Sequence, residues 1–518
     1  MSQVDVLYEH MKDDLELVQP PREESQVAKY FAGKTIFITG VTGFMGKCLI
    51  EKLLRDCPGV KHIFVLMREK KNTPVDELLK KYFQNIIFDR LRKVCPTFES
   101  KVTALKGDLA EEKLGLSEAD RDLIKNETNI MFHNAANVKF DIRVYLALQV
   151  NVLGTNSMLE LAHECKKLEM FMYVSTAYSH PYIQDVEETF YKPPADLNEV
   201  YVMMKKDLEM KDGMPEQFMQ TWLGKFPNIY TYTKAIAENL VKQHGQRAKF
   251  ICGVYRPSVV INAYNEPLAG WCGNKNGPVL VFIAAGLGVL HTAYHVCYPI
   301  DLVPSDYTTN ALLAVTWDNY SKGKTQCEPA VYNYGSTTVN PITLNGVHEF
   351  LTSNFSYTET PFSSVWKPFI IFSKNIYVFW IFHILFHFIP ACIVDLLLIV
   401  TGKKPKAVSL FLYATKHLDK INYFGNGNWR IHIKETVKVI DRLNAKDKEI
   451  FYCDMRKESF IWESYLGILW RGIRMYIMKE KLDSAKSYRK YIQICIVHYG
   501  AITVLVLLLL NWLMKFMS

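Results

Sequence analysis

At 518 residues the chain is too long for one simple hydrophobic core, so we expect two or three domains. A hydrophobic content of 49% with only 22% charged residues excludes a disordered or fibrous protein. The formal net charge of +8 is local, because seven Lys and Arg residues lie between positions 471 and 490. We therefore expect no nucleic-acid partner.

The chain begins with an acidic arm, residues 1–33, that lacks the basic start and apolar centre of a signal peptide. The 11 cysteines are scattered and form no C-x-x-C pair, as is typical of reduced thiols in a reducing compartment. Both observations favour the cytosol for the bulk of the chain.

Short apolar runs then alternate with helical patterns over residues 34–264. Repeated β-then-α units with continuous apolar strands predict an α/β fold, a doubly wound parallel sheet of the Rossmann type. The six predicted strands begin near Thr35, His62, Lys101, Asn129, Met170 and Phe250.

The first predicted strand runs into a glycine motif, TGVTGFMG, and then directly into a helical pattern. Glycines at this point allow a tight turn and let the backbone approach a pyrophosphate at the helix N-terminus. The motif therefore predicts nucleotide binding, against the alternative of a purely structural loop. The candidate cofactor contacts are Gly40, Thr42, Gly43, Phe44, Met45 and Gly46.

The second predicted strand ends at Arg68, where sheets that select NAD usually place an acid on the ribose hydroxyls. An arginine suits a 2′-phosphate, so NADPH is the predicted cofactor, and Lys70 and Lys71 add positive charge. The alternative is a solvated surface arginine.

Further candidate cofactor contacts follow the next strands. Asp108 comes after the third strand, and Ala135 and Ala136 come after the fourth, where small side chains allow close approach to the nicotinamide half. Asn151 lies on the following helix.

The stretch NIYTYTKAIAENL places Tyr230 and Lys234 four positions apart, on one face of a predicted helix. Such a pair is either ordinary helix surface or a proton donor with the cation that tunes it. The spacing alone leaves both readings open.

In their order along residues 34–310, these motifs resemble the extended short-chain dehydrogenase/reductase family. The resemblance implies that Thr176, with Ser175 as a close second, hydrogen-bonds the substrate carbonyl. It also implies that Tyr230 donates a proton to the oxygen while Lys234 lowers the tyrosine pKa and binds the nicotinamide ribose. The YRPSVV stretch matches the family's loop beside the nicotinamide, with Pro257 and Ser258 as contacts.

Beyond the predicted sheet the pattern loosens, and we expect a substrate-side lobe over residues 265–365 and a helical, membrane-associated domain over 366–485. Within the latter, residues 376–400 are apolar but contain His383, His387, Pro390 and Asp395. These polar residues favour a re-entrant or interfacial segment over a clean membrane span.

The last apolar stretch, residues 491–514, is predicted to be a transmembrane helix. As a helix it is about 36 Å long at roughly 1.5 Å per residue, enough to cross a hydrocarbon core of about 30 Å. The basic run before it predicts that the preceding domains face the cytosol. We expect a membrane protein with a C-terminal anchor, in the endoplasmic reticulum or the peroxisome.

Two histidine pairs, His291 with His295 and His383 with His387, could each share one helical face as metal ligands do. Such sites need several more histidines or carboxylates in matched motifs, and the sequence shows none. We therefore expect no metal.

Several stretches are more specific than the general family: TGVTGFMGK, HNAANVKF, VSTAY, PNIYTYTKA, EPLAGW, DLVPSD, FIPACIVDLLL and TGKKPK. Together, from about Gly33 to Gly472, they resemble eukaryotic fatty acyl-CoA reductases, including their C-terminal reductase-associated domain. His180 departs from the asparagine usual there. The resemblance implies reduction of a long-chain acyl-CoA to a primary alcohol with two NADPH.

Two alternatives stay open on the sequence. A membrane-bound 3β-hydroxysteroid-type dehydrogenase would share the glycine motif and the Tyr-Lys pair but not the domain after residue 375. A catalytically idle lipid-binding protein on the same fold would not need Thr176, Tyr230 and Lys234. The sequence does not indicate an oligomeric state or an acyl-chain preference.

Overall fold

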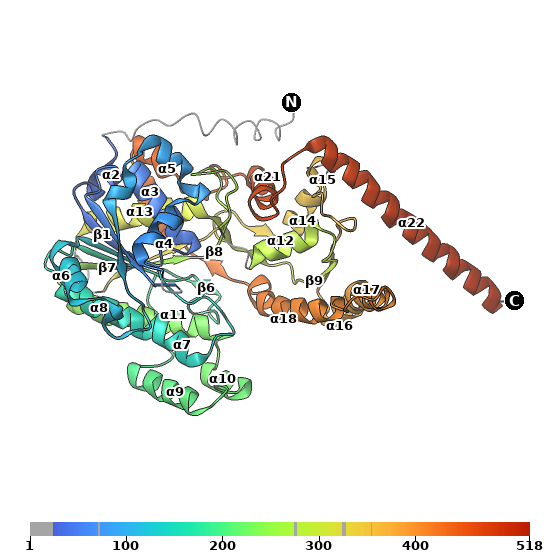
Figure 1. Cartoon of the computed structure of the whole chain (residues 1–518), viewed down its shortest axis with the longest axis horizontal. Coiled ribbons are helices and arrows are strands. Elements are labelled where there is room, and N and C mark those ends of the chain that lie inside the picture. Colours follow the sequence, from blue (N-terminus) through green and yellow to red (C-terminus); the bar gives the residue numbers. More distant parts are fainter. Residues whose placement is uncertain (1–23, 71–72, 274–276, 324–327, 354, 518) are drawn as a thin grey trace. The chain divides into compact units, whose positions relative to one another are not determined.

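The computed structural model describes residues 24–70, 73–273, 277–323, 328–353 and 355–517 (Figure 1). Most of the predicted acidic arm therefore lies outside the described residues. The chain forms two compact units. The first comprises the chain up to Trp271 with Asp301–Pro341 and Trp429–Phe460, and the second comprises Cys272–Ile300, Ile342–Asn428 and the chain from Ile461. The consecutive domain boundaries drawn from the sequence stay a prediction.

The first unit is built on a seven-stranded sheet with the order β12-β7-β5-β4-β1-β2-β3, in which every pairing is parallel. The strand order reverses between β1 and β4, which is where doubly wound sheets bind their ligands. This confirms the predicted fold class. The strands are β1 Thr35–Thr39, β2 His62–Met67, β3 Val102–Lys106, β4 Ile130–His133, β5 Met170–Val174, β7 Ile251–Pro257 and β12 Ala330–Tyr334.

Helices cover both faces of this sheet (Figure 1). On one side α3 (Phe44–Asp56) lies beside α13 (Ser305–Lys322), and on the other α8 (Gly154–Glu164) lies beside α11 (Ile229–Arg247). Alternate strand residues such as Phe37 pack into one buried core with α8 and α11. Burial on both faces explains why the strands are continuous apolar runs in the sequence.

The remaining elements of the first unit flank this sandwich. Two short parallel pairs, β8 (Val259–Ile261) with β11 (Leu302–Pro304) and β6 (Asp185–Val186) with β15 (Arg430–Ile431), add to it. The other helices are α2 Gln26–Phe31, α4 Val75–Phe83, α5 Asp89–Val94, α6 Glu118–Glu127, α7 Val144–Leu148, α9 Leu197–Glu209, α10 Glu216–Leu223, α19 Lys434–Arg442 and α20 Ala445–Ile450.

The second unit is mainly helical. It also holds two short strand pairs, β9 (Thr292–Tyr294) with β14 (Ile371–Ser373) and β10 (Pro299–Ile300) with β13 (Ile342–Thr343). Its helices are α12 Pro278–Gly286, α14 Leu344–Thr352, α15 Phe355–Glu359, α16 Ile376–His383, α17 Ile389–Val400, α18 Ala407–Gly425, α21 Trp462–Gly472 and α22 Ser484–Met517.

Two apolar helical segments of this unit have the length and composition to cross a membrane. One is Ile376–Val400, 25 residues long, and the other is α22, 34 residues long; their apolar 18-residue stretches have mean hydropathies of 2.2 and 2.3. Figure 1 shows α22 extending beyond α15 and α21. Asp395 is part of the first segment, and its carboxylate accepts backbone N–H bonds from Lys406, Ala407 and Val408 at 2.7–3.0 Å. This aspartate therefore joins α17 to the start of α18.

The basic run of residues 471–490 is buried in part. Arg471 and Arg474 are buried, and their guanidinium groups pair with Glu359 at 2.7 and 2.8 Å. Arg474 also pairs with Glu480 at 3.0 Å and donates to the Ser487 hydroxyl at the start of α22. These two arginines therefore hold Glu359 of α15, and Arg474 also holds the start of α22. The surface charge of the run lies on its other basic residues.

Candidate active site

The glycine motif forms the turn between β1 and α3. Gly40 has a φ of +78°, and a Cβ there would lie 2.6 Å from the backbone nitrogen of Ala135 in the loop after β4. A Cβ on Gly46 would lie 2.2 Å from the Gly40 carbonyl oxygen. Both positions therefore require glycine, the first for close approach of two loops and the second for packing of the helix against the turn.

The N-terminus of α3 is suited to bind an anion. Gly43 is its N-cap residue, so no side chain caps the helix, and the first turn contains no acidic residue. Thr42, Phe44 and Met45 lie in this turn, where unpaired N–H groups and the helix dipole favour a phosphate. Lys47, which the sequence analysis did not single out, donates from Nζ to the Thr42 carbonyl at 2.6 Å.

Arg68 and Asp108 meet at the edge of this turn. The Arg68 Nη1 lies 3.3 Å from the Asp108 carboxylate, and the Arg68 side chain is 69% exposed. They follow adjacent strands, β2 and β3, so the parallel pairing brings them together. The guanidinium therefore keeps most of its surface for a ligand. Lys70 is exposed nearby in sequence, whereas Lys71 lies outside the described residues.

The loop after β4 carries Ala135 and Ala136, and Asn151 holds this loop in place. Asn151 is 1% exposed; it accepts from the Asn137 backbone at 2.7 Å and donates to the hydroxyl of Thr233 at 3.0 Å. Its amide is thus engaged within the protein. It connects the loop to α11, and its direct cofactor contact stays a prediction.

Thr176 and Tyr230 lie side by side at the carboxyl end of β5. Their side chains hydrogen-bond one another, and this bond lowers the tyrosine pKa, while burial raises it by more, so the net shift is well above the ordinary value. Asn228 caps α11 by accepting from the Thr231 N–H at 3.0 Å, which fixes the first turn that presents Tyr230. The phenol is therefore a neutral proton donor.

Lys234 occupies the next turn of α11 and is 2% exposed. Its ammonium donates to the Val174 carbonyl at 2.7 Å and lies 4.6 Å from the centre of the Tyr173 ring. Burial lowers the pKa of Lys234 to about 7, and the charge of Glu238 opposes that shift. Lys234 is thus buried against β5 and is not part of a solvated helix surface, and its role beside Tyr230 stays a prediction.

Ser175 is engaged differently from Thr176. Its hydroxyl donates to the Glu238 carboxylate at 2.5 Å. The same carboxylate forms a two-point ion pair with the fully buried Arg256, at 2.9 and 2.7 Å. Glu238 was missed by the sequence analysis, although its position four residues after Lys234 was a usable signal. With Ser175 held by Glu238, Thr176 is the hydroxyl that meets the tyrosine.

The loop after β7 holds the last two predicted contacts. Pro257 accepts from the Ala177 N–H at 2.9 Å, which joins this loop to the segment that carries Thr176. The Ser258 hydroxyl donates to Asp301 at 2.6 Å, and Asp301 also accepts from Ser336 and Thr337. Ser258 thus anchors the loop through a buried aspartate of the DLVPSD stretch.

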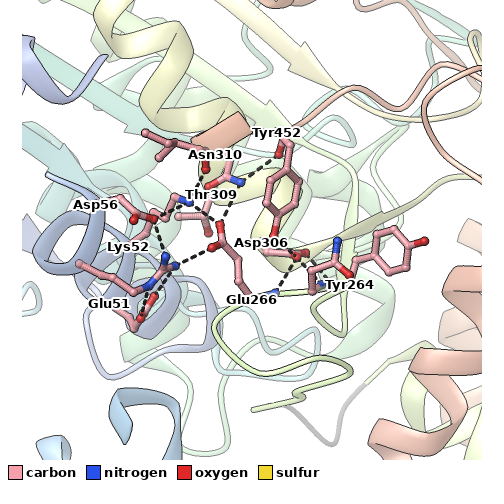
Figure 2. A network of polar contacts seen from close by, with 12 residues as sticks. Glu51, Lys52, Asp56, Tyr264, Glu266, Asp306, Thr309, Asn310 and Tyr452 are labelled. Atoms are coloured by element: carbon pink, nitrogen blue, oxygen red, sulfur yellow. Dashed lines mark hydrogen bonds and ion pairs between the residues drawn. The ribbon is translucent and has the colours of Figure 1, made fainter. Parts of the chain in front are cut away.

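A buried polar network holds the C-terminal half of α3, the helix that follows the glycine turn (Figure 2). Arg55 and Lys52 of α3 both pair with Glu266, and Arg55 does so at 2.8 Å. Asp306 accepts the backbone N–H groups of residues 264–266 and the Tyr452 hydroxyl, at 2.7–3.1 Å. The network therefore ties α3 to the EPLAGW loop and to α13.

Only one of the two histidine pairs lies on a helix. His291 and His295 flank strand β9 rather than lying on a helix, because the HTAYH stretch is extended. The His291 backbone N–H donates to Nε2 of His387 at 2.9 Å. Within the described part of the chain, no three His, Cys, Asp or Glu side chains gather as metal ligands. His180 is buried between Tyr191 and Phe226, with ring centres 5.1 and 6.1 Å away.

Comparison with known proteins gives the family. Two family models, both described as male sterility protein, match residues 38–312 and 386–480. Fatty acyl-CoA reductase 1 of Rattus norvegicus is 35% identical over 486 residues, which cover 93% of this chain and 92% of the relative. The chain belongs to the fatty acyl-CoA reductase family. It is accordingly an oxidoreductase with a nicotinamide-binding domain.

Other members of this family are similar over the same length. Fatty acyl-CoA reductase 1 of Homo sapiens is 34% identical, covering 93% of this chain and 92% of its own. Fatty acyl-CoA reductase wat of Drosophila melanogaster is 30% identical, covering 95% and 94%.

Solved structures share the fold. The terminal R domain of a myxalamid biosynthetic pathway aligns with a TM-score of 0.56 and 17% identity, over 92% of this chain and all of that one. A reductase domain of a nonribosomal peptide synthetase from Mycobacterium tuberculosis aligns with 0.54 and 15% identity, over 91% and 98%.

Proposed function

We propose that the protein reduces long-chain fatty acyl-CoA to the primary fatty alcohol with NADPH, releasing CoA. The observation that carries the proposal is the grouping of Thr176, Tyr230 and Lys234 at the switch-point edge of the sheet, in a chain similar to fatty acyl-CoA reductases over nearly its whole length. The family and the oxidoreductase class are established by similarity; the substrate and the cofactor phosphate are the proposal.

The reaction takes two hydrides. NADPH, when bound, supplies one hydride to the thioester carbonyl carbon and, from a second molecule, another to the aldehyde carbon. In the first step the carbon–sulfur bond then breaks and CoA leaves as a thiol, a good leaving group because its pKa is about 8.5. In the second step the aldehyde oxygen takes a proton and becomes the alcohol.

The residues of the site stabilise the charge that develops on oxygen in both steps. The hydroxyls of Thr176 and Tyr230 would donate to that oxygen, and Tyr230 would transfer its proton. The ammonium of Lys234 favours the phenolate that this transfer leaves behind. Lys234 would also bind the nicotinamide ribose.

The glycine turn and Arg68 would hold the cofactor. The close approach of the Gly40 and Ala135 backbones and the uncapped N-terminus of α3 fit a pyrophosphate, and the exposed guanidinium of Arg68 fits a 2′-phosphate. Ala136, Pro257 and Ser258 would line the nicotinamide end.

We also propose a membrane location, with α22 as the anchor and the catalytic domain in the cytosol. Exposed basic residues just before α22 and in its first turns, such as Lys481 and Arg489, favour that orientation. Two endomembranes that accept such anchors, the endoplasmic reticulum and the peroxisome, fit this topology. The domains drawn from the sequence, with catalysis in 34–264 and membrane association in 366–485, accord with this proposal.

The two alternatives have less support. A steroid dehydrogenase of the extended family is expected to lack the C-terminal domain, whereas residues 386–480 match the second family model. An idle lipid-binding protein would not require the Thr176–Tyr230 hydrogen bond or the buried Lys234.

The test is an assay of the purified full-length protein in lipid vesicles with palmitoyl-CoA and NADPH. We expect hexadecanol, free CoA and two NADPH consumed per alcohol. Aldehyde as the final product with one NADPH consumed, or steroid oxidation without any acyl-CoA turnover, would contradict the proposal.

A further inference from the structure

Residues 376–400, the segment from α16 to α17, turn their two histidines toward the protein. The imidazole of His383 lies 3.0 Å from the Thr415 hydroxyl of α18. His387 accepts the backbone N–H of His291, the residue before β9, at 2.9 Å. These polar side chains, which argued against a clean membrane span, are therefore directed away from the opposite face of the segment.

The opposite face is apolar and exposed, and α18 extends it. α17 packs against α18, and both helices leave apolar side chains in contact with solvent. We call the exposed apolar residues of 376–413 the α16–α18 face. Soluble domains rarely expose a surface of this kind, so it marks a contact with a membrane or another protein. Its six most exposed members are Tyr377, Ile381, Leu396, Val400, Leu410 and Tyr413.

The strands beside this segment argue against a membrane crossing. α16 packs against both β9 and β14, which pair with one another and form a sheet of two strands. Open sheet edges are tolerated in lipid hydrocarbon only where other protein buries them. Most residues of this pair are only half-buried, namely Ala293, Tyr294, Ile371 and Phe372. A crossing segment would carry them into the hydrocarbon, whereas a segment along the membrane surface keeps them outside it.

The turn between α17 and α18 adds positive charge at one end of the α16–α18 face. Lys403, Lys404 and Lys406 are all exposed. Asp395 is the one acidic residue from position 376 to 406, and backbone N–H groups occupy its carboxylate. An apolar helix face flanked by lysines fits the boundary between the acyl chains and the anionic headgroups of a lipid leaflet.

We propose that the α16–α18 face is a second membrane contact, which lies in the cytosolic leaflet and binds anionic phospholipid through the lysines of the turn. The inference rests on the membrane location proposed above and deepens it. The other membrane-length helix, α22, belongs to the same unit. The α16–α18 face holds this unit against the leaflet, whereas α22 crosses the membrane.

The first experiment uses the full-length protein in vesicles that contain an anionic phospholipid and a phospholipid with a photoreactive acyl chain. Light should label peptides of residues 376–413 as well as peptides of 500–517, which serve as the internal reference for α22. Leu385→Glu with Leu396→Glu should lower the labelling of 376–413 relative to that reference at least about tenfold, because two apolar contacts are lost. Both leucines are exposed, so the fold is retained.

A second variant, Lys403→Glu with Lys404→Glu, tests the headgroup contact. In anionic vesicles at low salt it should lower the same labelling ratio about fivefold or more for each lysine. In phosphatidylcholine vesicles its ratio should match wild type. The control is Lys80→Glu with Lys81→Glu, the same charge change at two adjacent exposed lysines of α4 in the first unit. The control should match wild type in both kinds of vesicle.

The outcomes separate this inference from the proposals on which it rests. Labelling of 500–517 without labelling of 376–413 would overturn the inference and leave α22 as the anchor, and no labelling of either segment would contradict the membrane location itself. Cross-links between two copies through 376–413, in place of lipid labelling, would assign the face to a second copy of the chain. Equal labelling in neutral and anionic vesicles would overturn the role of the lysines. No readout requires turnover, so failure to form alcohol would contradict the proposed reaction alone.

Discussion

At the scale of single residues, the proposed reaction depends most on Tyr230. Tyr230→Phe removes the group that donates to the oxyanion, so alcohol formation should fall by about 10²- to 10⁴-fold, the usual contribution of general acid catalysis. NADPH affinity, measured by fluorescence titration, should change little. Lys234→Ala should reduce the rate comparably and also weaken NADPH binding, because its ammonium has a second role at the ribose.

Tyr232 is the internal control for that experiment. It lies on another face of α11, 4% exposed, with its ring 5.3 Å from that of Phe226. Tyr232→Phe should therefore keep a near wild-type rate. Loss of turnover in Tyr232→Phe but not in Tyr230→Phe would show that Tyr232, and not Tyr230, is the catalytic tyrosine.

Glu238 favours the protonated form of Lys234. Its carboxylate favours the ammonium of Lys234, whose pKa is about 7. Of the groups on the sheet beside Lys234, Tyr173 has a pKa raised by burial and His133 one lowered to about 3, so both are neutral near pH 7. Glu238→Gln should lower the lysine pKa further and move the alkaline limb of kcat/KM to lower pH.

The measurement is kcat/KM from about pH 5.5 to about pH 9. Activity of Glu238→Gln should fall more at the alkaline end than at the acidic end, and Glu238→Asp should restore part of the profile. A uniform loss at every pH would mean that the residue only supports Arg256 and Ser175.

We expect Arg68 to select NADPH over NADH. Arg68→Asp removes a charge-assisted hydrogen bond to a 2′-phosphate and adds a second carboxylate beside Asp108. At about 1.5–3 kcal/mol per such bond, the KM for NADPH should rise about 10- to 100-fold, with little change for NADH. Arg68→Lys, which keeps the charge, should lie between. Equal effects of Arg68→Asp on both cofactors would refute the assignment.

How far the site could be predicted depends on whether its parts are local in sequence. The glycine turn and the Tyr230–Lys234 pair each lie within one short stretch, so their spacing carries the signal. Glu238 lies on the same helix, but its partner Arg256 is on β7, and nothing local shows that they meet. The hydrogen bonds of Asn151 with Thr233 and of Ser258 with Asp301 were not predicted, because these partners are far away in the sequence, and the cofactor contacts of both residues stay predictions.

At the scale of elements, six strands of the sheet could be predicted as apolar runs, because helices bury both faces of the sheet. The seventh, β12, was missed because Asn333 between two tyrosines interrupts its apolar run. It becomes a strand through its pairing with β7, a non-local contact. The HTAYH stretch was expected to be helical and is a strand. Two histidines four positions apart share one face of a helix and also one face of a strand, so their spacing did not distinguish the two. The pairing of β9 with β14, a non-local contact, makes the stretch a strand.

At the scale of the whole molecule, the two units each combine segments that are far apart in the chain. Domain boundaries predicted in order along the sequence cannot show such discontinuous units, because the units are defined by tertiary contacts. The buried pairs of Arg471 and Arg474 with Glu359 are an example: they join residues more than a hundred positions apart, and in the sequence the arginines read as part of a basic surface run.

Membrane attachment is the prediction that belongs to this scale. Truncation after Lys490 removes the apolar part of α22 but keeps Ser487, which the buried Arg474 holds. The shortened protein should therefore keep its fold and thermal stability and be released from membranes by alkaline carbonate, while the full chain resists. Protease added to intact vesicles should digest the catalytic domain of the full chain and leave at most a short C-terminal fragment. Full retention of the truncated protein would make Ile376–Val400 the anchor, and full protection of the catalytic domain would reverse the orientation inferred from the basic residues.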